Sequence, residues 1–216
     1  SRTSPKSLDW RSIMDGPQYC LRGSPKRIQT VMNAIDVIRR MHEHRESVNR
    51  KLLDSAAALN DEALRRPLPI GQGSVWKSLM HLYAAEYVWL QALLGDETAV
   101  LPGDRADKLP GNQEDVGGIQ SMAELRERWA DLENHWRAYL QDLSGDALDE
   151  VVFKVSSNGR RTGTLRSDLL LHVCTHAHYT AAQVVNMLRQ LGEASLPDPM
   201  LITLARQQRA QEHPKA

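Results

Sequence analysis

The chain has 216 residues, with 27 Lys or Arg against 27 Asp or Glu, so its formal charge is balanced. This balance, without a block of like charges, argues against a nucleic acid or an anionic membrane as the main partner. No apolar run approaches the roughly 20 residues that a membrane span needs, and no secretion signal is visible. Cys20 and Cys174 do not make a disulfide framework, so a reduced, cytoplasmic setting is expected.

Three regions are predicted along the chain. Residues 1–25 form an N-terminal arm, because prolines and glycines recur there among polar residues. The domain itself is placed at residues 26–207, and residues 208–216 are expected to be a flexible tail.

The domain begins with helical spacing over Lys26–Leu59, where the polar stretch HEHRES separates two apolar stripes. That stretch is a kink, a break or an exposed turn. His42 and His44 within it lie about 200° apart around a helix, so they cannot share an ion there. Both are expected on the solvated face.

A second helix is predicted from Ser74 to Leu94, after a connection at residues 60–73 that is rich in proline and glycine. Apolar residues surround this helix on nearly every side, so we expect it to be central. It contains a single histidine, His81. Taken alone, a buried histidine is more often a hydrogen-bonded core residue than a metal ligand. A long polar loop follows at residues 96–120.

The next two elements are a third helix and a hairpin. Ser121 and Glu124 have the spacing of a capping box, and the apolar stripe that follows runs to about Leu143. Residues 151–165 then become β-branched around Asn158–Gly159, which is typical of a β-hairpin. A two-stranded ribbon alone is marginally stable, so it must lean on the helices.

The most informative stretch runs from Ser167 to Gly192 and is predicted to be a fourth helix, with Ser167 as N-cap and Gly192 as its stop. Five polar residues step along it in one stripe: Asp168, His172, His176, Thr180 and Gln183. The helix is otherwise apolar enough to be buried, so this stripe must be hydrogen-bonded or hold a ligand. Two imidazoles one turn apart can bind one metal ion.

Together these elements predict an all-α protein, an antiparallel four-helix bundle with a small β-hairpin before the fourth helix. The sequence has no glycine-rich phosphate loop, no cysteine pair with metal spacing and no nucleophile elbow. Metal sites in bundles are built from side chains on facing helices. Whether a third histidine from another helix joins the pair on the fourth helix decides how much weight this signal carries.

Several segments, taken in order, resemble the DinB/YfiT-like superfamily of four-helix-bundle proteins. They are NRKLLDSAAALNDEAL, GQGSVWKSLMHLYAAEYVWLQALLG, DLLLHVCTHAHYTAAQVVNMLRQLG and the ending LPDPMLITLARQ, which span about Asn49 to Gln207. The resemblance implies a divalent metal ion, commonly nickel or zinc, on three histidines. One comes from the second helix and two, four residues apart, from the fourth. Several relatives are thought to be metal-dependent transferases or isomerases that use low-molecular-weight thiols.

The resemblance implies His81 as the first ligand and aligns Gln183 with a glutamine of the family. The other two ligand positions then fall on His176 and Thr180, and the second of these is not a histidine. In a first alternative, His81, His172 and His176 bind the metal. In a second, His81 and His176 bind it with help from water, Thr180 or Gln183. In a third, the metal site is lost.

We therefore expect one divalent metal ion, nickel or zinc, on His81, His172 and His176. The expected enzyme is a metal-dependent transferase or hydrolase that acts on a small molecule, with a low-molecular-weight thiol as a partner. Asp168 and Glu86 are candidates to accept hydrogen bonds from the outer imidazole nitrogens. The alternative is a non-catalytic bundle that has lost the metal and serves as a binding or dimeric scaffold protein, which exposed tryptophans on the third helix would favour. A homodimer is expected, with neither nucleic acid nor membrane as partner.

Overall fold

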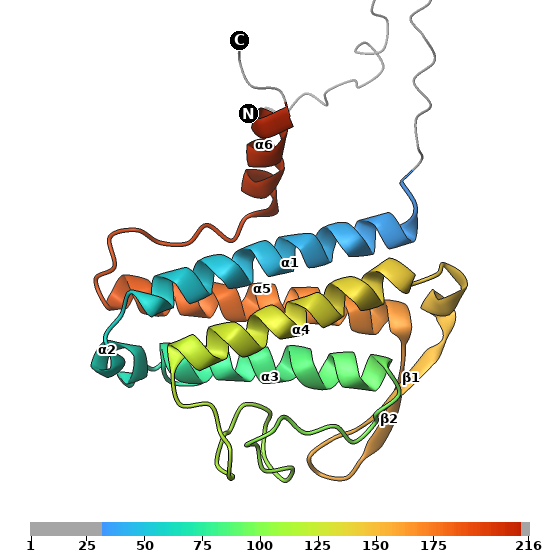
Figure 1. Cartoon of the computed structure of the whole chain (residues 1–216), viewed down its shortest axis with the longest axis horizontal. Coiled ribbons are helices and arrows are strands. Elements are labelled where there is room, and N and C mark those ends of the chain that lie inside the picture. Colours follow the sequence, from blue (N-terminus) through green and yellow to red (C-terminus); the bar gives the residue numbers. More distant parts are fainter. Residues whose placement is uncertain (1–31, 213–216) are drawn as a thin grey trace, which may run out of the picture. The chain divides into compact units, whose positions relative to one another are not determined.

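The structure is a computed structural model that describes residues 32–212. The predicted arm at residues 1–25 and the last four residues of the predicted tail lie outside this range. Most of the described chain is helical, and a small two-stranded antiparallel hairpin precedes the fourth long helix (Figure 1). The predicted all-α class with a small hairpin is confirmed at this level.

Four long helices lie side by side (Figure 1). They are α1 (Ala34–Ala57), α3 (Val75–Leu93), α4 (Met122–Asp142) and α5 (Arg166–Gln190). Helix α5 packs on both α1 and α3, and α4 contacts the same two helices. The shorter elements are α2 (Asp61–Arg65), the 3-10 helix η2 (Asp146–Asp149), β1 (Val151–Val155), β2 (Arg161–Leu165) and α6 (Leu201–Glu212).

The ends of the long helices follow largely from local sequence. Ser74 and Ser121 each accept a hydrogen bond from the backbone N–H three residues on, at 3.1 and 3.2 Å, so both predicted caps are confirmed. The prediction of Ser167 as the N-cap of α5 is wrong. Strand β2 passes directly into the helix, which begins at Arg166 without a side-chain cap. The helix stops as predicted, with Gly192 at φ +87° just beyond it.

The polar stretch of α1 is neither a break nor an exposed turn. The helix is continuous, and the side chains of His42 and His44 are only 2% and 7% exposed, so their predicted solvated face is wrong. His42 Nε2 lies 3.1 Å from the carbonyl oxygen of Leu170, and His44 Nε2 lies 2.8 Å from that of Pro199. Both sides of α1 are therefore covered, one by α5 and the other by the segment that follows α5.

The apolar core fills the space among the four long helices. Helix α3 is buried along most of its length, which confirms its predicted central position. On α4, Trp129 and Trp136 are 1% and 0% exposed. These tryptophans belong to the core, so the exposed aromatic face that would have favoured a scaffold protein is not present on α4.

The hairpin presents one face to the helices. Its turn contains Gly159 at φ +79°, within the predicted Asn-Gly bend. The register pairs Val152 with Thr164 and Lys154 with Thr162, so these four side chains share one face. Strand β1 contacts α3 and β2 contacts α5. The ribbon therefore leans on the helices, as its marginal intrinsic stability requires.

Helix α6 is attached to α1 by polar contacts, and none of its residues is buried. Arg40 Nη1 donates to Gln208 Oε1 at 2.6 Å, and Gln208 Nε2 donates to Glu43 Oε1 at 2.5 Å. The helix continues across residue 207, where the domain was predicted to end, and the domain boundaries stay predictions.

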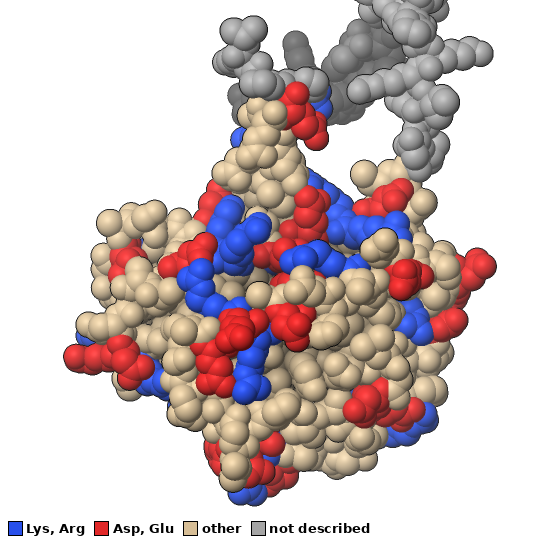
Figure 2. Space-filling view, viewed as in Figure 1, with Lys and Arg blue, Asp and Glu red and all other residues tan. Residues whose placement is uncertain are grey.

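Charged side chains of both signs are interspersed over the face shown in Figure 2. Some form ion pairs between helices, such as Arg126 with Asp54 at 2.8 Å. Within residues 32–212, no helix combines the length and the apolar character needed to cross a bilayer.

Candidate functional site

Three imidazole rings lie next to one another between α3 and α5. The ring centroids of His81 and His176 are 5.3 Å apart, and those of His172 and His176 are 5.8 Å apart. His176 is therefore the central ring, with His81 of α3 on one side and His172, one turn earlier on α5, on the other. The structure brings together the three predicted residues, and their role as metal ligands stays a prediction.

The ring of His81 is oriented by the long loop that follows α3. Its Nδ1 lies 2.8 Å from the carbonyl oxygen of Pro110. Because a carbonyl oxygen only accepts hydrogen bonds, Nδ1 is the donor, and in the neutral tautomer that makes this bond Nε2 has the lone pair. Metal-binding histidines are commonly held in this way, with the outer N–H donated to a carbonyl or carboxylate. The sequence suggested Asp168 or Glu86 as acceptors for the outer imidazole nitrogens. For His81 the acceptor is instead the carbonyl oxygen of Pro110.

The loop that carries Pro110 is held in shape by a buried carboxylate. Asp104, which is 8% exposed, accepts hydrogen bonds from the backbone N–H groups of Gly111 and Gln113 at 2.6 and 2.8 Å. Gly111 has φ +85°, and a Cβ at this position would lie 2.6 Å from the backbone N and Cα of His81. Glycine is therefore what allows the loop to lie directly against α3.

The central ring of the cluster is neutral at physiological pH. Burial, with the nearby His81 and His172, lowers the pKa of His176 to about 4. A neutral imidazole is the form that binds a metal ion. His176 therefore offers a neutral nitrogen donor near neutral pH, and no proton has to leave it before an ion binds.

This pKa predicts a pH dependence of stability. Between pH 6.5, the ordinary value, and about 4, the unfolded chain binds a proton on His176 that the folded protein does not. We therefore expect the free energy of unfolding to fall as the pH is lowered through this window. Burial and the nearby Arg45 lower the pKa of His42 to about 3, so His42 contributes in the same direction.

The test is chemical denaturation across this pH range for the wild type, His176→Gln and His135→Gln, an exposed histidine on α4. The His176 variant should show a shallower pH slope, and the His135 variant should follow the wild type. An unchanged slope in the His176 variant would contradict the prediction.

A cavity of about 700 Å³ adjoins the histidine cluster, a volume typical of small-molecule sites. It lies between the end of α3, loop residues 98–110 and the inner face of the hairpin. Two of its lining residues contact the cluster. The indole of Trp89 stands edge-to-face to the ring of His172 at 5.6 Å, and Pro110 accepts the hydrogen bond from His81. The histidines themselves lie just behind this wall.

Two of the three imidazoles, those of His81 and His176, have the spacing expected of two ligands on one metal ion, and His172 lies nearby. Two imidazoles on one ion have centroids roughly 5 Å apart, because each nitrogen lies about 2 Å from the metal. His81 and His176, at 5.3 Å, match this spacing. Within the described part of the chain, no group of three or more His, Cys, Asp or Glu is arranged so that it could hold an ion. His172 is exposed and would have to approach the other two rings.

The two residues of the second sequence alternative are placed differently. Thr180 is 2% exposed and lies one turn beyond His176 on α5. The side chain of Gln183 lies against Gly71 in the connection before α3, where a Cβ would come within 2.2 Å of its Oε1. Within residues 32–212, neither side chain hydrogen-bonds to a histidine of the cluster.

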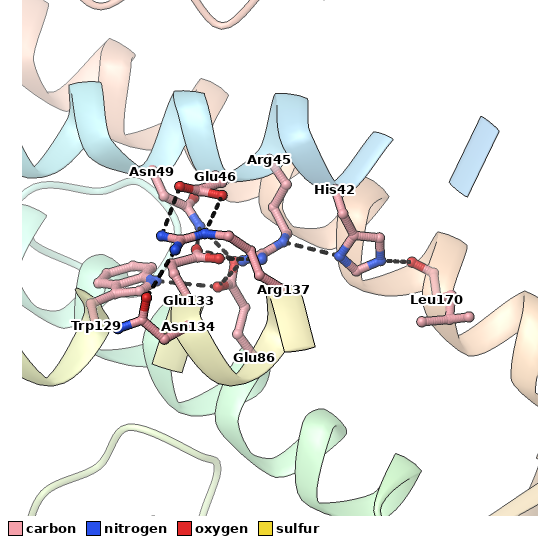
Figure 3. Close-up of polar contacts among 10 residues, drawn as sticks. All are labelled: His42, Arg45, Glu46, Asn49, Glu86, Trp129, Glu133, Asn134, Arg137 and Leu170. Carbon is pink, nitrogen blue, oxygen red and sulfur yellow. Dashed lines mark hydrogen bonds and ion pairs between the residues drawn. The ribbon is translucent and has the colours of Figure 1, made fainter. Parts of the chain in front are cut away.

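A separate polar cluster, which is buried, joins α1, α3 and α4 (Figure 3). Arg45 donates to both carboxylate oxygens of Glu133, at 2.8 and 2.5 Å, and also to Glu86. Asn49 and Trp129 donate to Glu86 at 2.8 and 3.2 Å. Burial raises the pKa of Glu86 to about 7, although Arg45 favours its ionised form. The guanidinium of Arg45 therefore lies between two carboxylates, and these three charged groups link the helices of the core.

The sequence analysis did not identify this cluster. A signal was available, since Arg45 and Asn49 lie on the same side of α1 as the apolar residues Ile38 and Leu52. Glu86 likewise lies on a helix that is apolar nearly all round. Polar residues within an apolar stripe indicate buried partners.

The fold and the site define a helical protein that presents imidazoles from two facing helices beside a small-molecule-sized cavity. The sequence profile of the DinB family matches residues 31–212, which is most of the chain, and the protein belongs to the DinB family. This confirms the resemblance seen in the sequence. No curated protein matches the chain at a significant level.

Proposed function

We propose that this DinB-family protein is an antiparallel four-helix bundle that binds one divalent metal ion, nickel or zinc, and acts on a small molecule. The ligands would be His81, His172 and His176. The observation that best supports this is the meeting of these imidazoles from α3 and α5, at 5.3 and 5.8 Å between centroids. The tautomer of His81 and the neutral ring of His176 suit metal binding as well.

A divalent ion on three imidazoles keeps an open position and lowers the pKa of a bound thiol or water. The chain's own Cys174 does not provide the thiolate, because burial raises the pKa of its thiol to about 12. In this proposal a thiol reaction uses a low-molecular-weight thiol from solution, and hydrolysis uses water. Trp89 and the apolar wall of the cavity would position the substrate and limit access of bulk water.

The second candidate function is a non-catalytic bundle that has lost the metal and serves as a binding or dimeric scaffold protein. Two observations favour it. Thr180 occupies a position that is a ligand in the family pattern, and in residues 32–212 no three donors are arranged to hold an ion. The buried tryptophans of α4 give it no support.

Metal content separates the two candidates. Untagged protein is incubated with nickel and with zinc, freed of excess metal, and assayed for metal per chain. We expect stoichiometric metal in the wild type and in His135→Ala, and loss of metal in His81→Ala and His176→Ala. Retention in His172→Ala would indicate the second alternative, in which only two histidines bind. A metal content near zero in the wild type would contradict the metal proposal and favour the non-catalytic binding or scaffold protein.

A further inference from the structure

The hairpin contributes a polar wall to the cavity. Val152, Lys154, Thr162 and Thr164, which form two cross-strand pairs, all line it. Trp89 and neighbouring apolar residues of α3 and the loop line it from the other side. The cavity is therefore amphipathic, with an ammonium and two hydroxyls on one wall and an aromatic surface on the other.

Among the cations of this lining, Lys154 differs from the others because it has no carboxylate partner within residues 32–212. Arg105 and Lys108 also line the cavity, and each is paired with a carboxylate of the same loop. Within residues 32–212, no carboxylate oxygen lies within salt-bridge distance of Lys154 Nζ, which lies 5.8 Å from the ring centroid of Trp89. Burial lowers the pKa of Lys154, and Asp96 offsets only part of this effect.

A half-buried ammonium without a partner favours an incoming anion. The cost of removing Lys154 from water is already included in the folded state, so a carboxylate that contacts it gains a charge-assisted hydrogen bond. Thr162 and Thr164 can donate further hydrogen bonds to the same group. The carboxylate of Asp104, also in the lining, is already occupied by N–H donors of the loop. It therefore does not compete for Lys154.

We propose that this cavity binds a small organic carboxylate, with its charged end on Lys154 and its apolar body against the indole of Trp89. Because Trp89 also contacts His172, a ligand along the indole extends from the ammonium toward the histidine cluster. As a binding site the cavity is independent of the metal. That the carboxylate is the substrate of the histidine cluster rests on the proposed function.

The experiment compares matched acids and amides. Benzoate, phenylacetate and cinnamate are titrated into the full chain against benzamide, phenylacetamide and cinnamamide, with binding measured by calorimetry. At least one acid should bind about tenfold more tightly than its amide, since only the acid can form a charge-assisted hydrogen bond with Lys154. Equal affinities for every pair, or no binding by any acid, would overturn the proposal.

Variants assign the effect to Lys154. Lys154→Met should weaken acid binding about tenfold without changing amide binding, and Lys154→Arg should retain most of the preference. The matched control is Lys108→Met, which removes a paired and exposed cation of the same cavity and should change affinity less than about twofold. If Lys108→Met weakens binding as much as Lys154→Met, a general positive field is responsible and the proposal is wrong.

One more variant separates this proposal from the metal proposal. His176→Ala should lose metal and still bind the acid, because His176 does not line the cavity. If the wild type binds no metal but shows the acid preference, the carboxylate site stands and the proposed function fails. If metal binds and no acid is preferred over its amide, the metal proposal stands and the carboxylate site fails.

Discussion

Replacing Arg45 by Met is expected to lower the free energy of unfolding by about 3 to 5 kcal/mol, which is the usual cost of removing one partner from a buried ion pair. The side chains of Arg45 and Glu86 are each 1% exposed, and that of Glu133 is 8% exposed. Without the guanidinium, two carboxylates remain in the core with no countercharge. Urea denaturation followed by circular dichroism measures the effect.

The matched control is Arg126→Met. Arg126 also joins α4 to α1, through Asp54 at 2.8 Å, but both members of this pair are exposed. Its loss should cost less than about 1 kcal/mol. Adding Glu86→Gln and Glu133→Gln to Arg45→Met should recover part of the stability, because the uncompensated charges are then removed. If Arg45→Met and Arg126→Met are equally mild, the buried cluster does not stabilise the fold as described.

Gly111→Ala should detach the loop from α3 and weaken the histidine site. Its φ of +85° disfavours any side chain, and the new Cβ would meet the backbone of His81 at 2.6 Å. Strain and overlap together should cost about 2 to 4 kcal/mol, so the loop moves away instead and the hydrogen bond from His81 to Pro110 is lost. Hydrogen exchange at the amides of Gly111 and Gln113, which are bonded to Asp104, should become much faster.

Gly117→Ala is the control for Gly111→Ala, because Gly117 has φ +84° in the same loop but nothing within 4 Å of its Cβ position. It carries the backbone strain without the contact. We expect it to leave exchange at Gly111 and Gln113 near the wild-type rate, and to preserve any metal binding. If both variants loosen the loop equally, the close approach to His81 is not what holds it.

The Arg45 cluster and the histidine cluster use polar groups in different ways. Around Arg45, charges are compensated by partners inside the protein, which favours stability and one arrangement of α1, α3 and α4. At the histidine cluster, burial keeps the ring of His176 neutral, and the nearby ammonium of Lys154 has no carboxylate partner in the described chain. Donors without internal partners beside a cavity are the groups that a ligand can engage.

Much of the fold was accessible from sequence because its signals are local. Helical spacing, the serine caps and the Asn-Gly bend each depend on residues a few positions apart, so the long helices and the hairpin were predicted close to where they lie. The stripe of His172 and His176 on α5 is local too, since residues four apart lie on one face of a helix. The same patterns carried the resemblance to the DinB family, which the match to residues 31–212 confirms.

Tertiary structure alone decided which faces meet. Helical spacing places His81 on a side of α3, but only the packing of α3 on α5 sets it beside His176. The carbonyl of Pro110 has no side-chain signature, so no sequence pattern could point to it as the partner of His81. His44 was expected on the solvated face, and only the segment that follows α5 covers it. The periodicity of a helix shows which of its faces is apolar, but not which element packs against that face. The packing partner depends on contacts between residues far apart in the chain.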